Sequence, residues 1–206
     1  MSVIICPGIH SVELTNQFLA GFGQTFCEAL VFPAHQLPAY SALHILEFIQ
    51  ESEEKRLNEP QKAAPLFFIA FSAGVVGAIG AARLWHRAGG RVGAVIAIDG
   101  WGVPLYGGFP IHRISHDFFT HWTSAGLGAG QDGFYADPAV GHLDLWRSPQ
   151  TVSGQWVRHL EGDRIAITAS KFILALLHSS TLNSGGAGVQ SPPELGDSGG
   201  RGVSPI

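Results

Sequence analysis

Residues 65–83 constrain the fold of this chain more than any other segment. They begin with five consecutive apolar residues, 66–70, a run that is too short for a helix. Such a run is typical of a strand that is buried on both faces of a parallel sheet. Helical spacing begins only after Ser72. The chain is therefore predicted to pass from strand to helix through a tight bend at this serine.

Small residues surround this bend. Ala70, Ala73 and Gly74 flank Ser72, and the helix continues with further small residues, namely Gly77, Ala78, Gly80, Ala81 and Ala82. Glycine lowers helix propensity, so close packing of the helix against the sheet best explains this composition. Ser72 is then exposed on a strained turn, or alternatively it serves only as the N-cap of the helix.

Composition indicates one globular domain. The 206 residues are 46% hydrophobic and 14% charged, which excludes a disordered chain or a coiled coil. The net charge of -4, without a basic cluster, argues against a nucleic-acid surface. Two cysteines do not indicate a disulfide framework. Because the chain enters a strand directly, we expect no signal peptide, no membrane span and a cytoplasmic location.

Strands and helices are predicted to alternate along the chain. This order favours right-handed crossovers and a mostly parallel sheet with helices on both faces, an α/β fold. We assign the domain to residues 1–182 and a flexible tail, rich in Gly, Ser and Pro, to 183–206. The predicted strands are 3–6, 28–33, 66–70, 92–98 and 111–115, and the predicted helices begin near residues 11, 41 and 72, with closing helices at 153–159 and 164–178.

The bend and a late Gly141-His142 pair together resemble the α/β-hydrolase superfamily. The superfamily motif, small-x-Ser-x-small, here reads Ala-Phe-Ser-Ala-Gly over residues 70–74, with alanine in place of the usual first glycine. The likeness covers about residues 2–178 and is to small, lid-poor esterases, lipases and thioesterases that lack the two leading strands. The turn after the first strand has no HG or HGGG signature.

The resemblance implies a catalytic triad. Ser72 would be the nucleophile and His142 the base, and the acid would be Asp117, with Asp99 as the alternative. The oxyanion hole would combine the N–H of Ala73 with that of Ile9 or His10, in the turn at residues 7–11. That turn is equally well explained as an ordinary strand ending.

Trp101, Leu105 and Tyr135 are the candidate substrate-binding residues. Trp101 and Leu105 lie in an aromatic and glycine-rich connection that could line an acyl pocket or, as we favour, form an irregular loop that fills the core.

His112, His116 and His121, near Asp117, have a spacing that would suit zinc. Solvated or hydrogen-bonded histidines are the more ordinary explanation, and we assign no metal and no cofactor.

The function expected from these residues is that of a serine hydrolase, which cleaves an ester or thioester of a small or acyl-chain substrate through an acyl-enzyme intermediate. The alternative is a catalytically inactive protein of the same fold that binds a lipid or a protein partner. The partner expected for the enzyme is a small molecule, and the oligomeric state is left open.

Overall fold

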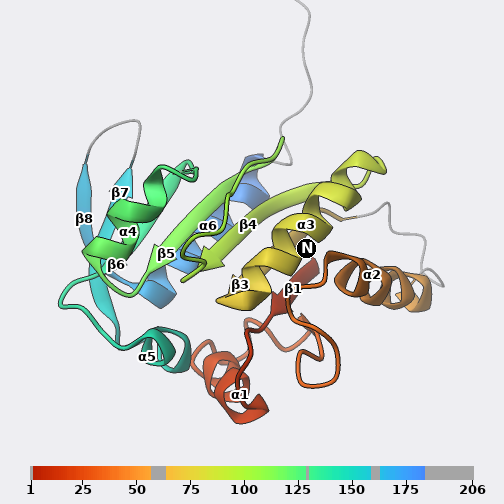
Figure 1. Ribbon diagram of the computed structural model, residues 1–206, viewed down its shortest axis with the longest axis horizontal. Coiled ribbons are helices and arrows are strands. Elements are labelled where there is room, and N and C mark those ends of the chain that lie inside the picture. The colour runs from red at the N-terminus through yellow and green to blue at the C-terminus, as the bar shows by residue number, and fades with distance from the viewer. Residues whose placement is uncertain (1, 57–63, 129, 159–162, 184–206) are drawn as a thin grey trace, which may run out of the picture.

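The computed structural model describes residues 2–56, 64–128, 130–158 and 163–183. Eight strands and six helices form within these residues (Figure 1). Their order is β1 (Ser2–Cys6), α1 (Val12–Ala20), β2 (Leu30–Val31), α2 (Ala42–Arg56), β3 (Leu66–Phe71), α3 (Ala73–Arg87), β4 (Val92–Ile98), β5 (Ile111–Ser115), α4 (Phe118–Ala125), β6 (Asp132–Ala136), α5 (His142–Arg147), β7 (Ser153–Arg158), β8 (Arg164–Thr168) and α6 (Ala169–Asn183).

The strands form a single sheet in the order β2-β1-β3-β4-β5-β6-β7-β8. Neighbouring strands from β2 to β6 pair in parallel, whereas β7 and β8 add an antiparallel edge. The predicted α/β fold with a mostly parallel sheet is therefore confirmed. Because parallel strands end at a common edge, the turns that follow β1, β3 and β4 come together there.

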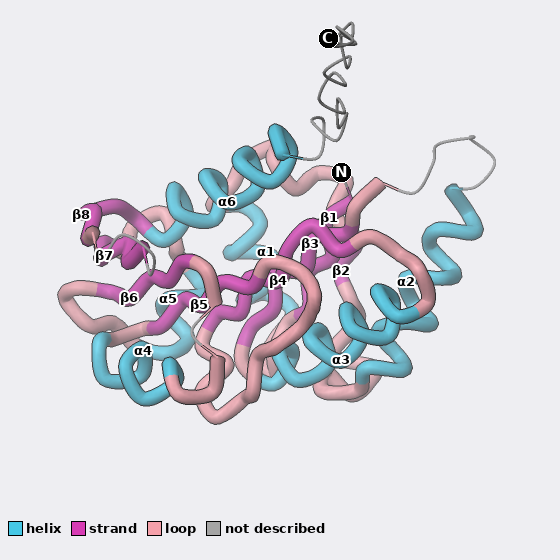
Figure 2. Tube along the Cα trace, turned by 90° about the horizontal axis from the view of Figure 1, so that it is seen from above, coloured by secondary structure: helices cyan, strands magenta, loops and turns pink. Residues whose placement is uncertain are grey.

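Helices cover both faces of the sheet, as predicted (Figure 2). Alternate residues of each central strand enter different cores: Val3 and Ile5 pack on one side, and Ile4 and Cys6 on the other. The first core includes residues of α1, α5 and α6, and the second includes residues of α2 and α3. Burial on both faces explains why these strands have continuous apolar sequences.

The predicted closing helix at 153–159 is wrong, and the one at 164–178 is wrong in its first part. Residues 153–158 and 164–168 are strands, and helix α6 begins only at Ala169. Ile165 and Ile167 alternate with other residues, as expected of a strand, and Trp156 pairs with Phe134 of β6. Of the predicted tail, only Asn183 lies within the described residues, where it ends α6.

None of the helices in the described ranges combines the length and the apolar character needed to cross a bilayer.

Glycine at position 74 lets the start of α3 lie against the end of β1. A Cβ atom there would overlap the backbone carbonyl oxygens of Cys6 and Pro7. Backbone atoms cannot yield as a flexible side chain can, so only glycine fits without moving the strand or the helix. The small residue predicted at this position therefore has a packing role.

We expect Gly74→Ala to destabilise the protein by about 2–3 kcal/mol and to lower Tm by roughly 4–12 °C, measured by thermal unfolding. Gly126→Ala is the matched control. Gly126 has a φ of -63° and no heavy atom within 4 Å of its Cβ position, so alanine there should be neutral or slightly stabilising. Equal Tm values for the two variants would contradict the packing role of Gly74.

Candidate functional site

Ser72 lies on a strained bend between β3 and α3. Its φ of 52° and ψ of -123° are unfavourable for a residue that has a side chain. The bend is held by the Ser72 N–H, which donates to the carbonyl oxygen of Ile98 at 2.9 Å. The serine makes no side-chain cap of α3, although it occupies the N-cap position. Helix capping therefore does not account for the serine, and its hydroxyl is left for another use.

His142 is the first residue of α5, and its ring lies beside this bend. The imidazole stacks on Phe71, the residue before Ser72, with 4.6 Å between ring centroids. Its Nδ1 is 2.8 Å from Oδ2 of Asp99. A neutral imidazole that donates from Nδ1 carries a lone pair on Nε2, so this arrangement leaves Nε2 able to accept a proton.

Asp99 follows β4 and is also held in an unusual conformation. Its φ is 50°, and its side chain is 1% exposed. A buried carboxylate is costly unless it accepts hydrogen bonds. The structure thus brings together Ser72, His142 and the alternative acid, Asp99.

Asp117, the acid favoured by sequence position, lies elsewhere. It is the N-cap of α4, where its Oδ1 accepts from the Thr120 N–H at 2.6 Å. Partial burial works against ionisation, but the hydrogen bonds from Thr120 and the nearby His116 outweigh it and lower the pKa of Asp117. Its Oδ2 is 3.3 Å from His116 Nε2, not against His142.

His116 also contacts Asp99, which the sequence did not predict. Its Nδ1 is 2.9 Å from Oδ2 of Asp99, the same oxygen that His142 contacts. The only signal in the sequence is its place directly after β5, because strand ends in a parallel sheet share one edge.

A metal site at His112, His116 and His121 is not formed within the described part of the chain. The one group of potential ligands found there is Asp99, His116 and His142. Zinc bonds of about 2.0–2.1 Å in tetrahedral geometry would hold neighbouring ligand atoms roughly 3.3 Å apart. The two Nδ1 atoms are only 2.8 and 2.9 Å from Asp99 Oδ2, so hydrogen bonds explain the group better than a metal. His112 is buried, and desolvation lowers its pKa.

The turn after β1 lies directly against the serine. A Cβ atom on Gly8 would be 3.0 Å from the Ser72 Cβ and from the Phe71 carbonyl oxygen. Within the described residues, no backbone hydrogen bond occupies the N–H groups of Ile9, His10 or Ala73. The three predicted oxyanion donors are therefore in segments that meet at Ser72, although Ile9 as a whole is 74% exposed.

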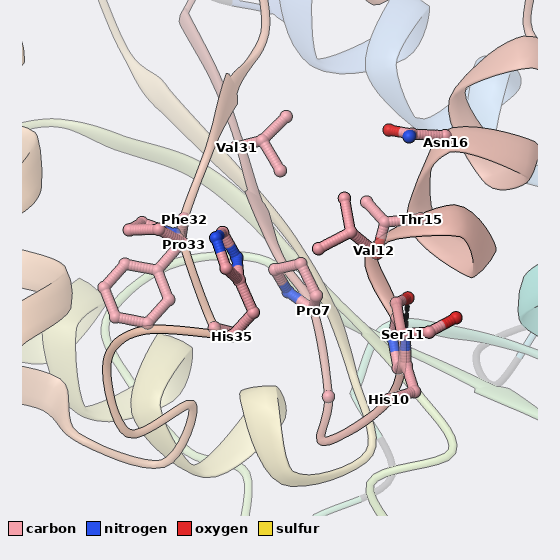
Figure 3. A pocket seen from close by; sticks show the side chains of 12 residues that line it. Pro7, His10, Ser11, Val12, Thr15, Asn16, Val31, Phe32, Pro33 and His35 are labelled. Carbon is pink, nitrogen blue, oxygen red and sulfur yellow. Dashed lines mark hydrogen bonds between the residues drawn. The ribbon is translucent and has the colours of Figure 1, made fainter.

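A pocket of about 290 Å³ lies beside this turn (Figure 3). Its walls come from the turn after β1, the start of α1, and β2 with the loop that follows it. Gly8 lines the pocket and also contacts the serine bend, which connects the two. Half of the twelve lining residues have apolar side chains, namely Pro7, Val12, Val31, Phe32, Pro33 and Ala34.

The three predicted substrate-binding residues do not line this pocket. Trp101 is 67% exposed and donates from Nε1 to Thr123 Oγ1 at 3.2 Å. Leu105 is 3% exposed and packs in the core between the sheet and α3, as the loop interpretation expects. Tyr135 is buried at β6, beside Phe118 and His121.

Cys6 is an unsuitable competitor for Ser72 as a nucleophile. It is buried at the end of β1, and desolvation strongly raises the pKa of its thiol. A thiol held in its protonated form is a poor nucleophile.

Comparison with known proteins finds only a weak structural similarity. The sequence matches no family model and no curated protein. One similar solved structure is YbtT, a type II thioesterase from the yersiniabactin NRPS/PKS biosynthetic pathway, with a TM-score of 0.34 and 17% sequence identity. The match covers 47% of this chain and 41% of that one, so it spans less than half of the thioesterase.

We expect Asp117→Ala to lower the free energy of unfolding by about 1 kcal/mol at pH 7, because α4 loses its N-cap. Asp117→Asn should retain most of this stability, since asparagine is also a good N-cap. The folded state lowers the pKa of Asp117, so its ionised form stabilises the protein above the ordinary Asp pKa of about 3.9. The advantage of wild type over Asp117→Asn should therefore shrink as the pH falls below about 4, measured by urea unfolding; a constant difference would contradict this assignment.

Proposed function

We propose that this protein is a serine hydrolase of the α/β-hydrolase type, which cleaves an ester or thioester through an acyl-enzyme intermediate. Ser72 is the nucleophile, His142 the general base and Asp99 the acid. One observation carries the proposal: the imidazole that contacts the buried Asp99 carboxylate at 2.8 Å also stacks beside the strained Ser72 bend.

The reaction follows from the proton positions. His142 Nε2 removes the hydroxyl proton of Ser72 as Oγ attacks the substrate carbonyl carbon. The imidazolium is stabilised by Asp99 and returns the proton to the alkoxide or thiolate as the carbon–oxygen or carbon–sulfur bond breaks. Water then attacks the acyl-enzyme by the same route, releasing the carboxylic acid and restoring the Ser72 hydroxyl.

The turn after β1 would stabilise the tetrahedral intermediate. The N–H of Ala73 and that of Ile9 or His10 are assigned to the developing oxyanion, because these groups flank Ser72 and have no other backbone partner among the described residues. Removal of one such donor typically slows acyl transfer by about 10²–10³-fold.

Asp99 is the proposed acid because its Oδ2 is 2.8 Å from Nδ1 of the base, His142, and because its strand is the neighbour of the strand that carries the serine. β4 lies directly beside β3, which carries the serine, whereas Asp117 follows β5, one strand further away. A carboxylate that is 1% exposed also interacts with an imidazolium more strongly than a solvated one would.

The apolar pocket is proposed to receive the acyl group. The leaving group must lie next to His142, which protonates it, and His142 is held on the β4 side of the serine. The pocket lies toward β1 and β2 in the sheet order, bounded by the turn after β1, the start of α1, and Val31 with the loop after β2. At about 30 Å³ for each water-sized unit, the pocket holds on the order of ten such units, which is room enough for an acyl chain.

A fluorophosphonate probe tests the nucleophile. We expect stoichiometric labelling of the folded protein at Ser72, located by peptide mass spectrometry, and no labelling of Ser72→Ala or of heat-unfolded protein. A folded wild-type protein that does not react would end the hydrolase proposal and favour a non-catalytic binding protein.

Substitution of the two candidate acids separates their roles. Asp99→Asn should lower kcat by about four orders of magnitude, because the amide no longer fixes and stabilises the imidazolium. Asp117→Asn should cost far less, since Asp117 does not contact His142. Glu47→Gln, on the exposed face of α2, is the control for loss of a carboxylate and should retain full activity. A larger loss in Asp117→Asn than in Asp99→Asn would reverse the assignment.

A series of p-nitrophenyl esters from acetate to decanoate tests the acyl pocket with a constant leaving group. We expect kcat/KM to rise up to about fourfold for each added methylene until the pocket is full. Val12→Trp, which narrows the pocket, should remove this rise while acetate cleavage changes little. Leu43→Trp, on exposed α2, is the control. The pocket assignment fails if Val12→Trp and wild type show the same chain-length profile.

A further inference from the structure

We propose that His116 is a positioning residue of this site, which holds the Asp99 carboxylate in the orientation that serves His142. The inference rests on the proposed hydrolase function and extends it to a second imidazole. It assigns to His116 neither contact with substrate nor proton transfer.

Among the described residues, His116 supplies two of the three hydrogen bonds to the carboxylate. Its backbone N–H donates to Asp99 Oδ1 at 2.9 Å, and its ring Nδ1 approaches Oδ2 at 2.9 Å. The third contact is from His142 Nδ1 to Oδ2, at 2.8 Å. One carboxylate oxygen has lone pairs for two donors, so the two imidazoles can share Oδ2 without displacing each other.

The burial of Asp99 makes these contacts necessary. Its side chain is 1% exposed, so water does not replace a lost donor. His142 is the most exposed member of the group, at 42%, and as the base it also changes its charge during the reaction. Held by His142 alone, the carboxylate would be oriented only by its most exposed partner. The two bonds from His116 fix the carboxylate at both oxygens.

His116 is itself held by two further contacts. Its Nε2 lies 3.3 Å from Asp117 Oδ2, and Asp117 is anchored by the N-terminus of α4. Its carbonyl oxygen accepts from the Val140 N–H at 3.0 Å, within the loop that leads to His142. The same residue therefore connects the acid to the segment that carries the base. Asp117 acts in this network by orienting His116.

The geometry requires a donor at one particular atom. The side-chain amide nitrogen of asparagine can occupy the place of histidine Nδ1, whereas that of glutamine corresponds more closely to Nε2. Asparagine at position 116 can therefore still donate to Asp99 Oδ2, and alanine cannot. Glutamine keeps the amide but directs it away from Asp99, toward Asp117.

Three variants and one control test the proposal by steady-state kinetics on a p-nitrophenyl ester. We expect His116→Ala and His116→Gln to lower kcat on the order of 100-fold with KM little changed, because the base is misplaced while substrate binding is retained. His116→Asn should recover most of the lost kcat. His44→Ala removes an imidazole of α2 that is hydrogen-bonded to Ser41, just before that helix, and it should be without effect. Equal losses in His116→Asn and His116→Ala, or full activity of His116→Ala, would overturn the positioning role.

A spectroscopic measurement separates this inference from the hydrolase proposal. An imidazole Nδ1–H that donates to a buried carboxylate gives a downfield proton NMR signal, which is assigned to His142 by its loss in His142→Gln. We expect this signal in wild type and His116→Asn, and its loss or broadening in His116→Ala. An unchanged signal in folded His116→Ala refutes the positioning role whether or not Ser72 reacts with fluorophosphonate. If the NMR signals behave as expected but fluorophosphonate does not label Ser72, only the hydrolase proposal is refuted.

Discussion

The arrangement of the site depends on one buried carboxylate. Asp99 ends β4 with a side chain that water barely reaches, and its charge is tolerated because three N–H donors point at it. Two of these donors belong to the loop after β5, and the third belongs to the helix that follows β6. The hydrogen bonds to this carboxylate therefore join the segments that follow β4, β5 and β6. They also hold the imidazole of His142 beside the bend at Ser72.

The sheet supplies the precision that such a group needs. Parallel strands that are buried on both faces cannot slide without exposing apolar side chains, so their ends are fixed relative to one another. Gly74 and Gly8 then allow the serine bend and the turn after β1 to meet at van der Waals distance. The two positive-φ residues other than glycine among the described residues, Ser72 and Asp99, both lie at this edge, where strain is maintained by the surrounding packing.

The sequence was informative where local pattern and burial coincide. The continuous apolar runs predicted the central strands, and the small residues around Ser72 predicted the bend, because both reflect close contact on all sides. It was less informative where the outcome depends on distance in space. Whether Asp99 or Asp117 meets His142 depends on strand order and loop path, and both acids follow predicted strands. β8 was mistaken for part of a helix because the apolar residues Ile165 and Ile167 continue without a break into the helical segment that begins at Ala169.

In the hydrolase mechanism that we propose, the exposure of His142 has a consequence for the acyl-enzyme. With 42% of its side chain exposed, the imidazole is in direct exchange with bulk solvent. Water can then reach the imidazole without movement of a lid. Its concentration is also far higher than that of any alcohol or thiol that could accept the acyl group. A site of this kind favours discharge of the acyl group as a free acid over its transfer to a second alcohol or thiol.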